Sequence, residues 1–376
     1  MRLAAQFFLL LLLSFSGRAW SASSTEFSQH EIFHQGDDGV NTYRIPALVE
    51  TAHGVLIAVA DARHDNAKDL PNRISLVMRR SFNDGKDWEP IRTIQEVREG
   101  GVGDASLLLD RSNGRVWCFF NYGPPGIGFR NAKPGMLTGP TTLQVHAIHS
   151  DDDGATWSQS IDLTPQLKKA SWQAMFAASG TDIQTSSGRF LMPLVVRDGS
   201  GVIHSVNAYS DDHGETWKTG EFIGANTDES HNIELESGVI LQNMRNGRYR
   251  SIAYSHDGGI TFGPVTHDTA LIDAICNAGI ARLHTKSRNV LLFTNAASDR
   301  RENLTIKLSH DDGHTWPTVK TINAGPSGYS TVVPLSDGGI AVLYERGSKY
   351  YAEQITFAYF GLGWVTGRIP SEQPSG

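Results

Sequence analysis

Three arginines stand at the ends of apolar segments, an unusual setting for a charged side chain. Arg44 opens an apolar stretch in the sequence Tyr-Arg-Ile-Pro, Arg245 ends GVILQNMR, and Arg301 follows NVLLFTNA and a short polar turn. A single arginine is usually a solvated surface group. Three arginines that converge from distant parts of the chain would instead offer several rigid donors to one carboxylate, which the planar guanidinium binds better than lysine does. The pattern therefore indicates a site for a ligand that carries a carboxylate.

Other catalytic motifs are absent or lack the context that they need. His30 and His34 fit the HExxH zinc pattern, but that chemistry requires a helix that places both histidines on one face. Here the five residues alternate like a first strand and run into Gly-Asp-Asp-Gly, and positions i and i+4 of a strand lie too far apart to share one zinc. No GxSxG elbow occurs. We predict no metal site and no cofactor, with calcium at the Asp-rich repeats described next as a minor alternative.

One short phrase recurs five times and indicates a repeat architecture. Four copies fit Ser-x-Asp-x-Gly-x-Thr followed by Trp or Phe, and a fifth, SFNDGKDW, is degenerate. These copies, which we call Asp boxes, span residues 81–88, 150–157, 210–217, 255–262 and 309–316. Asp and Gly favour a tight reversal, the hydroxyls bond local backbone, and the closing aromatic side chain can pack between neighbouring units. The boxes therefore predict turns of the scaffold rather than catalytic groups.

The segments between the boxes predict strands. They are short, apolar or alternating, and each follows a glycine-containing turn, whereas no long stripe of helical period appears after the N-terminus. Strand, turn, strand, box and strand make a four-stranded meander, and radial repetition of a meander gives a propeller. About 355 mature residues at about 40 to 60 per blade favour six blades, one of them without a box. We expect an all-β fold, a six-bladed β-propeller of four-stranded antiparallel blades, as a single catalytic domain over residues 22–366.

The two ends of the chain predict export and a loose tail. Arg2 precedes an apolar run over 7–15, and Ala-Trp-Ser at 19–21 resembles a signal-peptidase site. The run is too short to span a membrane, so we assign residues 1–21 to a secretory signal peptide, with an uncleaved anchor as the weaker alternative. The protein is then expected to be secreted or periplasmic. Residues 367–376 are expected to form a disordered tail.

Cysteine usage and charge limit the partners. Cys118 lies in the apolar segment VWCFF, which favours a buried thiol, and a Cys118–Cys276 disulfide in an exported protein has no support from spacing. The formal net charge is −7 and no basic run occurs, which argues against nucleic acid and anionic membrane surfaces as partners.

The YRIP motif, the Asp boxes and their spacing resemble the exo-sialidases, the secreted bacterial neuraminidases in particular. The resemblance covers residues 27–345. It implies that Arg44, Arg245 and Arg301 clamp the substrate carboxylate, with Arg300 as the alternative for the third. It also implies that Glu345, in LYERG, steadies Arg44.

The resemblance further implies a catalytic set. The family's tyrosine nucleophile matches Tyr329 in SGYST. Its activating glutamate, sixteen positions before the second arginine, matches Glu229 rather than Glu234. Its acid/base aspartate matches Asp69, in the loop before the strand that leads to the first box, with Asp65 as a competitor.

Three further matches concern the sugar pocket. Arg63 and Asp104 match residues near the carboxylate and the ring hydroxyls, and residues 176–184 resemble the lining of the N-acyl pocket.

The chemistry of sialic acid explains these residue types. A carboxylate on the anomeric carbon would repel a carboxylate nucleophile but not a neutral phenol, and sialidases with a tyrosine nucleophile depart from the two-carboxylate scheme of glycosidases. Tyrosine has a pKa near 10, so a neighbouring base must accept its proton. The acid must carry a proton for the leaving oxygen.

The resemblance implies a retaining exo-α-sialidase that acts on sialylated glycoproteins, glycolipids or oligosaccharides through a covalent tyrosyl intermediate. A non-catalytic sialic-acid-binding propeller would keep the arginines but lose Asp69, Tyr329 or Glu229. A trans-sialidase or a hydrolase of deaminated keto-sugar acids stays open, since linkage, acceptor and N-acyl preferences do not follow from one sequence.

Overall fold

The computed structural model describes residues 26–367, apart from 136, 138 and 286–288. The predicted signal peptide, and the tail beyond residue 367, lie outside the described residues. In the described part, strands dominate and the α-helices are short. The helices are α1 (Thr164–Leu167) and α2 (Leu362–Thr366), with 3-10 turns η1 (Asp37–Gly39) and η2 (Gly139–Thr141). No helix of the described residues is both long enough and apolar enough to cross a membrane.

The strands of the described residues form five sheets, and the first two sheets come from the N-terminal half of the chain. One contains β2 (Thr42–Glu50), β3 (Leu56–Arg63), β4 (Ile74–Ser81) and β5 (Arg92–Gln95). The next contains β6 (Gly101–Leu109), β7 (Val116–Gly123), β8 (Gln144–Ser150), β9 (Ile161–Asp162) and β11 (Gly180–Thr181).

The third and fourth sheets follow in chain order. The third contains β10 (Ala174–Ala177), β13 (Phe190–Arg197), β14 (Ile203–Ser210) and β15 (Lys218–Thr219), with β12 (Ile183–Gln184) paired to β13. The fourth contains β16 (Ser230–Glu234), β17 (Ile240–Met244), β18 (Tyr249–Ser255) and β19 (Thr266–Ile272).

The last sheet has seven strands and joins the two ends of the chain. It contains β20 (Gly279–His284), β21 (Asn289–Ala296), β22 (Glu302–Ser309), β23 (Thr318–Pro334), β24 (Ile340–Arg346), β25 (Gln354–Phe360) and β1 (Phe27–His34). The long strand β23 pairs with β22 through its first part and with β24 through its second part. The sheet is therefore two four-stranded halves that share β23.

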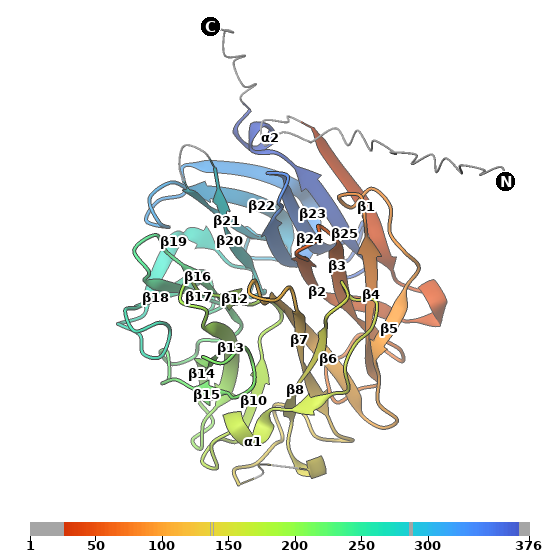
Figure 1. The fold of residues 1–376 in the computed structure, drawn as a ribbon, viewed down its shortest axis with the longest axis vertical. Coiled ribbons are helices and arrows are strands. Elements are labelled where there is room, and N and C mark those ends of the chain that lie inside the picture. Colours follow the sequence, from red (N-terminus) through yellow and green to blue (C-terminus); the bar gives the residue numbers. More distant parts are fainter. Residues whose placement is uncertain (1–25, 136, 138, 286–288, 368–376) are drawn as a thin grey trace, which may run out of the picture.

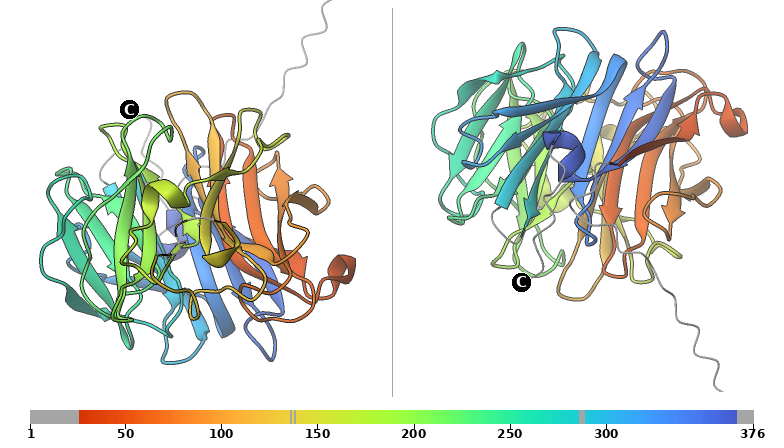
Figure 2. Two further views of the ribbon diagram at one scale, coloured as in Figure 1. Left: turned by 90° about the horizontal axis from the view of Figure 1, so that it is seen from below. Right: turned by 90° about the horizontal axis from the view of Figure 1, so that it is seen from above.

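The sheets follow one another around the molecule in chain order (Figure 1), and the two further views in Figure 2 show the same succession. The circle closes where the N-terminal strand β1 pairs antiparallel with the C-terminal strand β25. The predicted all-β fold of antiparallel sheets is confirmed, with one local difference. Strand β11 pairs parallel with β6 over two residues, because the segment after β10 leaves its own sheet and lies beside β6.

Each Asp box connects the third and fourth strands of a sheet or half-sheet, as the turn prediction required. In the box at 150–157, the backbone N–H of Gly154 donates to Ser150 Oγ at 2.8 Å, and Thr156 Oγ1 donates to Asp152 Oδ2 at 2.6 Å. The degenerate copy keeps the turn with exchanged groups, since Asn83 Nδ2 donates to Asp87 Oδ2 at 2.9 Å.

The glycine of a box also sets the contact with the preceding sheet. Gly154 has φ 74°, and a Cβ there would lie 2.8 Å from Ile57 of β3. Gly214 has φ 91°, and a Cβ there would lie 2.8 Å from the Trp117 ring of β7. Both positions therefore require glycine for conformation and for space. No turn joins β25 to β1, since they come from opposite ends of the chain, which explains why this pair has no box.

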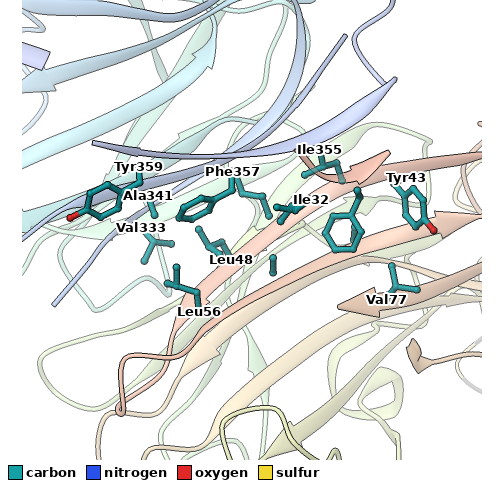
Figure 3. Close-up of a cluster of buried hydrophobic side chains, with 14 of the residues drawn as sticks. Ile32, Tyr43, Leu48, Leu56, Val77, Val333, Ala341, Ile355, Phe357 and Tyr359 are labelled. Atoms are coloured by element: carbon teal, nitrogen blue, oxygen red, sulfur yellow. The ribbon is translucent and has the colours of Figure 1, made fainter. Parts of the chain in front are cut away.

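Apolar side chains between neighbouring sheets form the core. Figure 3 shows the cluster where both ends of the chain meet, with Ile32 and Leu48 facing Ile355 and Phe357. The ring of Trp88, from the first box, lies 5.1 Å from that of Phe357 in an edge-on arrangement. Each such buried side chain contributes roughly 1.5–3 kcal/mol, so closure of the circle stabilises the positions of β2, β23 and β24.

Both cysteines are buried free thiols. Cys118 and Cys276 form no disulfide with each other, so the disulfide alternative is wrong in this structure.

Candidate active site

The strand register separates the site from the boxes. Arg44, near the start of β2, pairs with Asp61 on β3. At the other end of β2, Glu50 pairs with Leu56 on β3. Leu56 in turn pairs with Ser81, the first residue of an Asp box. The boxes and the predicted site residues therefore lie at opposite ends of the strands.

Bulges on the inner strands aim the site residues. The pairing register shifts between Arg44 and Ala47 on β2, between Gly103 and Ser106 on β6, and between Ser327 and Ser330 on β23. Ile45 and Asp104, inside two of these bulges, have φ values of 61° and 57°. Bulges beside active sites commonly redirect side chains, and residues held at positive φ carry local strain.

Tyr329 and Glu229 form the centre of the site. The Tyr329 hydroxyl donates to Glu229 Oε2 at 2.5 Å, and both side chains are buried. Arg245 Nη1 lies 2.5 Å from the same carboxylate oxygen and donates to the Tyr329 hydroxyl oxygen at 3.1 Å. Burial and the Glu229 charge raise the pKa of Tyr329 well above its ordinary value, although Arg245 and Arg44 oppose them. The phenol therefore keeps its proton and points it at a carboxylate.

Arg44 is held by a carboxylate that also holds the Tyr329 backbone. Arg44 donates through Nε and Nη2 to the two oxygens of Glu345, at 2.9 and 3.1 Å. Glu345 also accepts from the backbone N–H groups of Ile45 and Tyr329, both at 3.0 Å. Burial alone would raise the pKa of Glu345, but Arg44 and the backbone donors outweigh it and lower the value. The predicted support of Arg44 by Glu345 is present in the geometry.

Arg301, rather than Arg300, reaches the cluster. The Arg301 guanidinium lies 5.4 Å from the centre of the Tyr329 ring, as does that of Arg44 at 5.2 Å, and Arg300 is exposed. The structure therefore brings all three predicted arginines around Tyr329. Close approach of cations to a ring face is itself favourable.

Asp69 lies at the mouth of the site and is held by Arg63. Arg63 is buried and donates to Asp69 Oδ1 at 2.8 Å and to Asp61 Oδ2 at 3.1 Å, while the Asp69 side chain is 82% exposed. Partial desolvation by the surrounding site raises the pKa of Asp69, but the positive charges of Arg63 and Arg44 outweigh this effect and lower the pKa. The competitor Asp65 instead faces the exposed Arg73 at 3.5 Å.

Asp104 lies beside this group. Its backbone N–H donates to Asp61 Oδ1 at 2.9 Å, and Asn121 Nδ2 donates to its Oδ2 at 3.4 Å. Burial, reinforced by the charge of Asp61, raises the pKa of Asp104 well above its ordinary value, and the pKa of Asp61 rises to about 6 because of its own burial. A neutral carboxyl at Asp104 can donate a hydrogen bond to a sugar hydroxyl as well as accept one.

The segment 176–184 is divided between two environments. Ala177 exchanges backbone hydrogen bonds with the Asn121 side chain, at 2.8 and 3.1 Å, next to Asp104. Asp182 is buried and accepts from Ser106 at 2.7 Å, so it belongs to the interior between the inner strands.

Two residues of the site had not been predicted. Asp61 links Arg63 to the Asp104 backbone, and its position two residues before Arg63 on a strand, hence on the same face, was an available signal. The Tyr351 ring lies 4.6 Å from the guanidinium of Arg301 and 5.4 Å from that of Arg44. Tyr351 lies in a loop, and no local pattern identifies it.

A cavity of about 800 Å³ lies at the other end of the inner strands. Val49, Leu109 and Pro334 contribute apolar lining. Its charged groups are paired locally, as in the contact of Arg282 Nη2 with Asp312 at 3.1 Å. The potential catalytic groups all lie at the opposite mouth.

Metal ligation has no candidate in the described residues, where no group of three or more His, Cys, Asp or Glu side chains could hold an ion. His30 and His34 lie on strand β1, as expected from their alternation.

The fold and site define a repeat-built β-protein with an arginine-rich site suited to an anionic ligand. The chain belongs to the BNR repeat-like domain family, whose model matches residues 77–342.

Its relatives include a sialidase of Micromonospora viridifaciens, 36% identical over an alignment of 363 residues that covers 91% of this chain and 55% of the relative. A sialidase of Bacteroides fragilis is 33% identical over an alignment of 337 residues that covers 83% of this chain and 61% of the relative. The chain thus spans little more than half the length of these two curated relatives.

Among solved structures, the Hadza microbial sialidase Hz136 matches with a TM-score of 0.83 and 31% identity, over 90% of this chain and 69% of that chain. A leech intramolecular trans-sialidase matches with a TM-score of 0.80 over 90% of this chain and 71% of that chain. At 18% identity, the second likeness concerns the fold alone.

Proposed function

We propose that this protein is an exo-α-sialidase that releases terminal sialic acid from glycoconjugates with retention of configuration, through a covalent intermediate on Tyr329. The observation that carries the proposal is the 2.5 Å hydrogen bond from the Tyr329 hydroxyl to Glu229 inside a group of three arginines. The relatives named as sialidases support the release of sialic acid.

The arginines would bind the substrate carboxylate. Arg44 is fixed by Glu345, Arg245 contacts the nucleophile and base, and Arg301 faces the same tyrosine ring. Guanidinium groups bind carboxylates through charge-assisted hydrogen bonds, each worth roughly 1.5–3 kcal/mol. Such a clamp would fix the anomeric carbon, which bears the carboxylate, next to the Tyr329 oxygen.

Tyr329 would attack as its proton leaves. Because burial raises the pKa of Tyr329, the free phenolate is disfavoured, and the proton must pass to Glu229 as the oxygen forms its bond to the anomeric carbon. Arg245, which contacts both groups, would stabilise the charge that shifts between them. Hydrolysis of the tyrosyl intermediate would return the proton from Glu229 to Tyr329.

Asp69 would protonate the leaving oxygen and later activate water. Its contact with Arg63 favours the ionised form, so the acid role requires substrate binding to weaken that contact. A bound substrate brings a negative carboxylate and displaces water from the mouth, and both effects raise the pKa of a nearby carboxyl group.

The proposed scaffold is a six-bladed propeller. Counting β23 in both halves of the seven-stranded sheet, the pairing gives six groups of at least four strands, which follow one another around the molecule. This count agrees with five boxes and one pair of strands, β25 and β1, that comes from the two chain ends.

A direct test uses the purified protein with a 4-methylumbelliferyl sialoside. We expect release of the fluorophore, an α-anomeric first product by proton NMR, and attachment of a 2,3-difluorosialic acid label to the peptide that contains Tyr329. No release from wild-type protein would refute the activity, and a β-anomeric first product would refute the covalent route. Transfer to an added sugar acceptor instead of water would favour the trans-sialidase alternative.

A further inference from the structure

Ile275 has an unusual backbone conformation at the edge of the site. Its φ is 54°, and the residue is 53% exposed. A β-branched residue in the left-handed region is a conformational outlier, because its side chain crowds the backbone there. Such strain persists only where the surrounding structure enforces it, and it is found mostly at functional sites.

A buried ion pair enforces this conformation. Arg250 is fully buried and donates through Nη1 to Asp273 Oδ2 and to the carbonyl oxygen of Cys276, both at 3.0 Å. Asp273 Oδ1 accepts from the backbone N–H of Cys276 at 3.1 Å. The two residues that flank the turn at Ile275 are therefore tied to the same guanidinium.

The turn contacts one of the three clamp arginines. Arg301 Nη2 donates to the carbonyl oxygen of Ile275 at 3.1 Å. Each of the other two clamp arginines is paired with a carboxylate, Arg44 with Glu345 and Arg245 with Glu229. Within the described part of the chain, Arg301 has no carboxylate within 4.0 Å, and an uncharged carbonyl takes that place.

We propose that Ile275 is a positioning residue for substrate binding: its enforced left-handed backbone aims a neutral carbonyl at Arg301, which orients the guanidinium without neutralising it. Arg301 then meets the substrate carboxylate with its full charge, whereas a carboxylate partner at this place would repel the substrate. The inference rests on the proposed function, and it adds to that proposal a residue that touches no reacting atom.

The test compares substitutions that differ in backbone freedom. Ile275→Gly accepts the positive φ without strain but leaves the carbonyl free to rotate. Ile275→Val keeps the β-branch and shortens the side chain by one methylene. Asp84→Gly is the matched control, since Asp84 has a φ of 59° in an Asp box at the far end of the strands. Steady-state kinetics on the fluorogenic sialoside and thermal midpoints are measured for the wild-type protein and for these three variants.

We expect Ile275→Gly to raise KM about tenfold, the scale of one weakened hydrogen bond to a charged group, with kcat changed less than about twofold. Its thermal midpoint should stay equal or rise, since strain is released. Ile275→Val and Asp84→Gly should keep the wild-type KM. In an Arg301→Lys background, adding Ile275→Gly should change KM by less than about twofold, because the two residues act through one contact.

Three results would overturn the inference. The first is an unchanged KM in Ile275→Gly. The second is an equal rise of KM in Ile275→Val, which would indicate direct contact of the side chain with substrate. The third is a full tenfold effect of Ile275→Gly on KM that persists in the Arg301→Lys background. The proposed function fails separately: wild-type protein would then neither hydrolyse the sialoside nor bind N-acetylneuraminate in calorimetry. If wild type binds without hydrolysis, the same comparison is made on Kd, and the same three results decide it.

Discussion

Glu345 connects the carboxylate clamp to the nucleophile, and its replacement by glutamine tests that connection. The side chain is fully buried and accepts four hydrogen bonds, two from Arg44 and one each from the backbones of Ile45 and Tyr329. Glutamine keeps one acceptor oxygen and presents an NH₂ group where the other oxygen was. Two of the four contacts then set donor against donor.

The expected cost follows from the burial of Arg44. Removing one charge of a buried ion pair leaves the other uncompensated, which costs about 3–5 kcal/mol. For a chain of this size each kcal/mol lowers the thermal midpoint by roughly 1.5 °C, so Glu345→Gln should lose about 5–7 °C at pH 7. The relative loss of activity should be larger than the relative loss of stability, because Arg44 and the Tyr329 backbone lose the carboxylate that positions both of them.

The pH dependence of the thermal midpoint tests the sign of the Glu345 contribution to stability. The pKa of Glu345 is lowered in the folded state, so its contribution to stability is complete above the unfolded-state pKa of about 4.3 and is lost as the pH falls through the lower folded-state value. Differential scanning fluorimetry of wild type and Glu345→Gln between pH 7 and pH 3 should therefore show a gap that is constant near neutrality and narrows in acid.

The control is Glu50→Gln, whose carboxylate accepts from the backbone and hydroxyl of Ser336 at the surface, at 2.8 and 2.7 Å. That substitution should cost less than about 1 kcal/mol. A Glu345→Gln midpoint within 2 °C of wild type, or a gap that widens in acid, would refute the reasoning.

The other predictions concern catalysis, the scaffold and export. Tyr329→Phe removes the nucleophilic oxygen and should reduce hydrolysis at least about 10³-fold while the thermal midpoint and N-acetylneuraminate binding persist; full activity would contradict the covalent route. Asp69→Ala should lose much more activity on sialyllactose than on an aryl sialoside, whose leaving group needs little protonation, and an equal loss on both would transfer the acid role to Asp65. Asp152→Ala breaks an Asp box and should lower stability by about 1–2 kcal/mol in chemical denaturation with unchanged KM, whereas a raised KM would link the boxes to the site. Intact mass of protein exported by a secretion-competent host should show cleavage after Ser21, and a full-length mass would favour the anchor alternative.

The architecture could be predicted from local sequence patterns, because its turns and strands depend on residues close in sequence. Each Asp box bonds within its own eight residues, as Ser150 and Asp152 do, so its turn is encoded locally and can be predicted from one copy. The alternating strands between boxes follow for the same reason. The parallel pairing of β11 with β6 joins segments more than seventy residues apart, and no local sequence pattern predicts this pairing.

The site was predicted differently, through a family resemblance that supplied Tyr329, Glu229 and the arginines. The residues alone indicated only arginines in unusual places. Asp61 was missed although it lies two residues before Arg63 on the same strand, which places both side chains on one face. Tyr351 was missed because its contact with Arg301 joins a loop to a distant part of the chain.

The repeated turns, the strands and the residue types able to bind a carboxylate can be predicted from the amino-acid sequence, since these properties belong to short segments and single side chains. Three contacts of the site depend on the folded chain. Arg301 rather than Arg300 faces Tyr329, Glu345 holds both Arg44 and the Tyr329 backbone, and Asp69 is paired with Arg63. Positions adjacent in sequence differ in direction by the strand pleat and by bulges, and residues hundreds of positions apart meet only when the first and last strands close the circle.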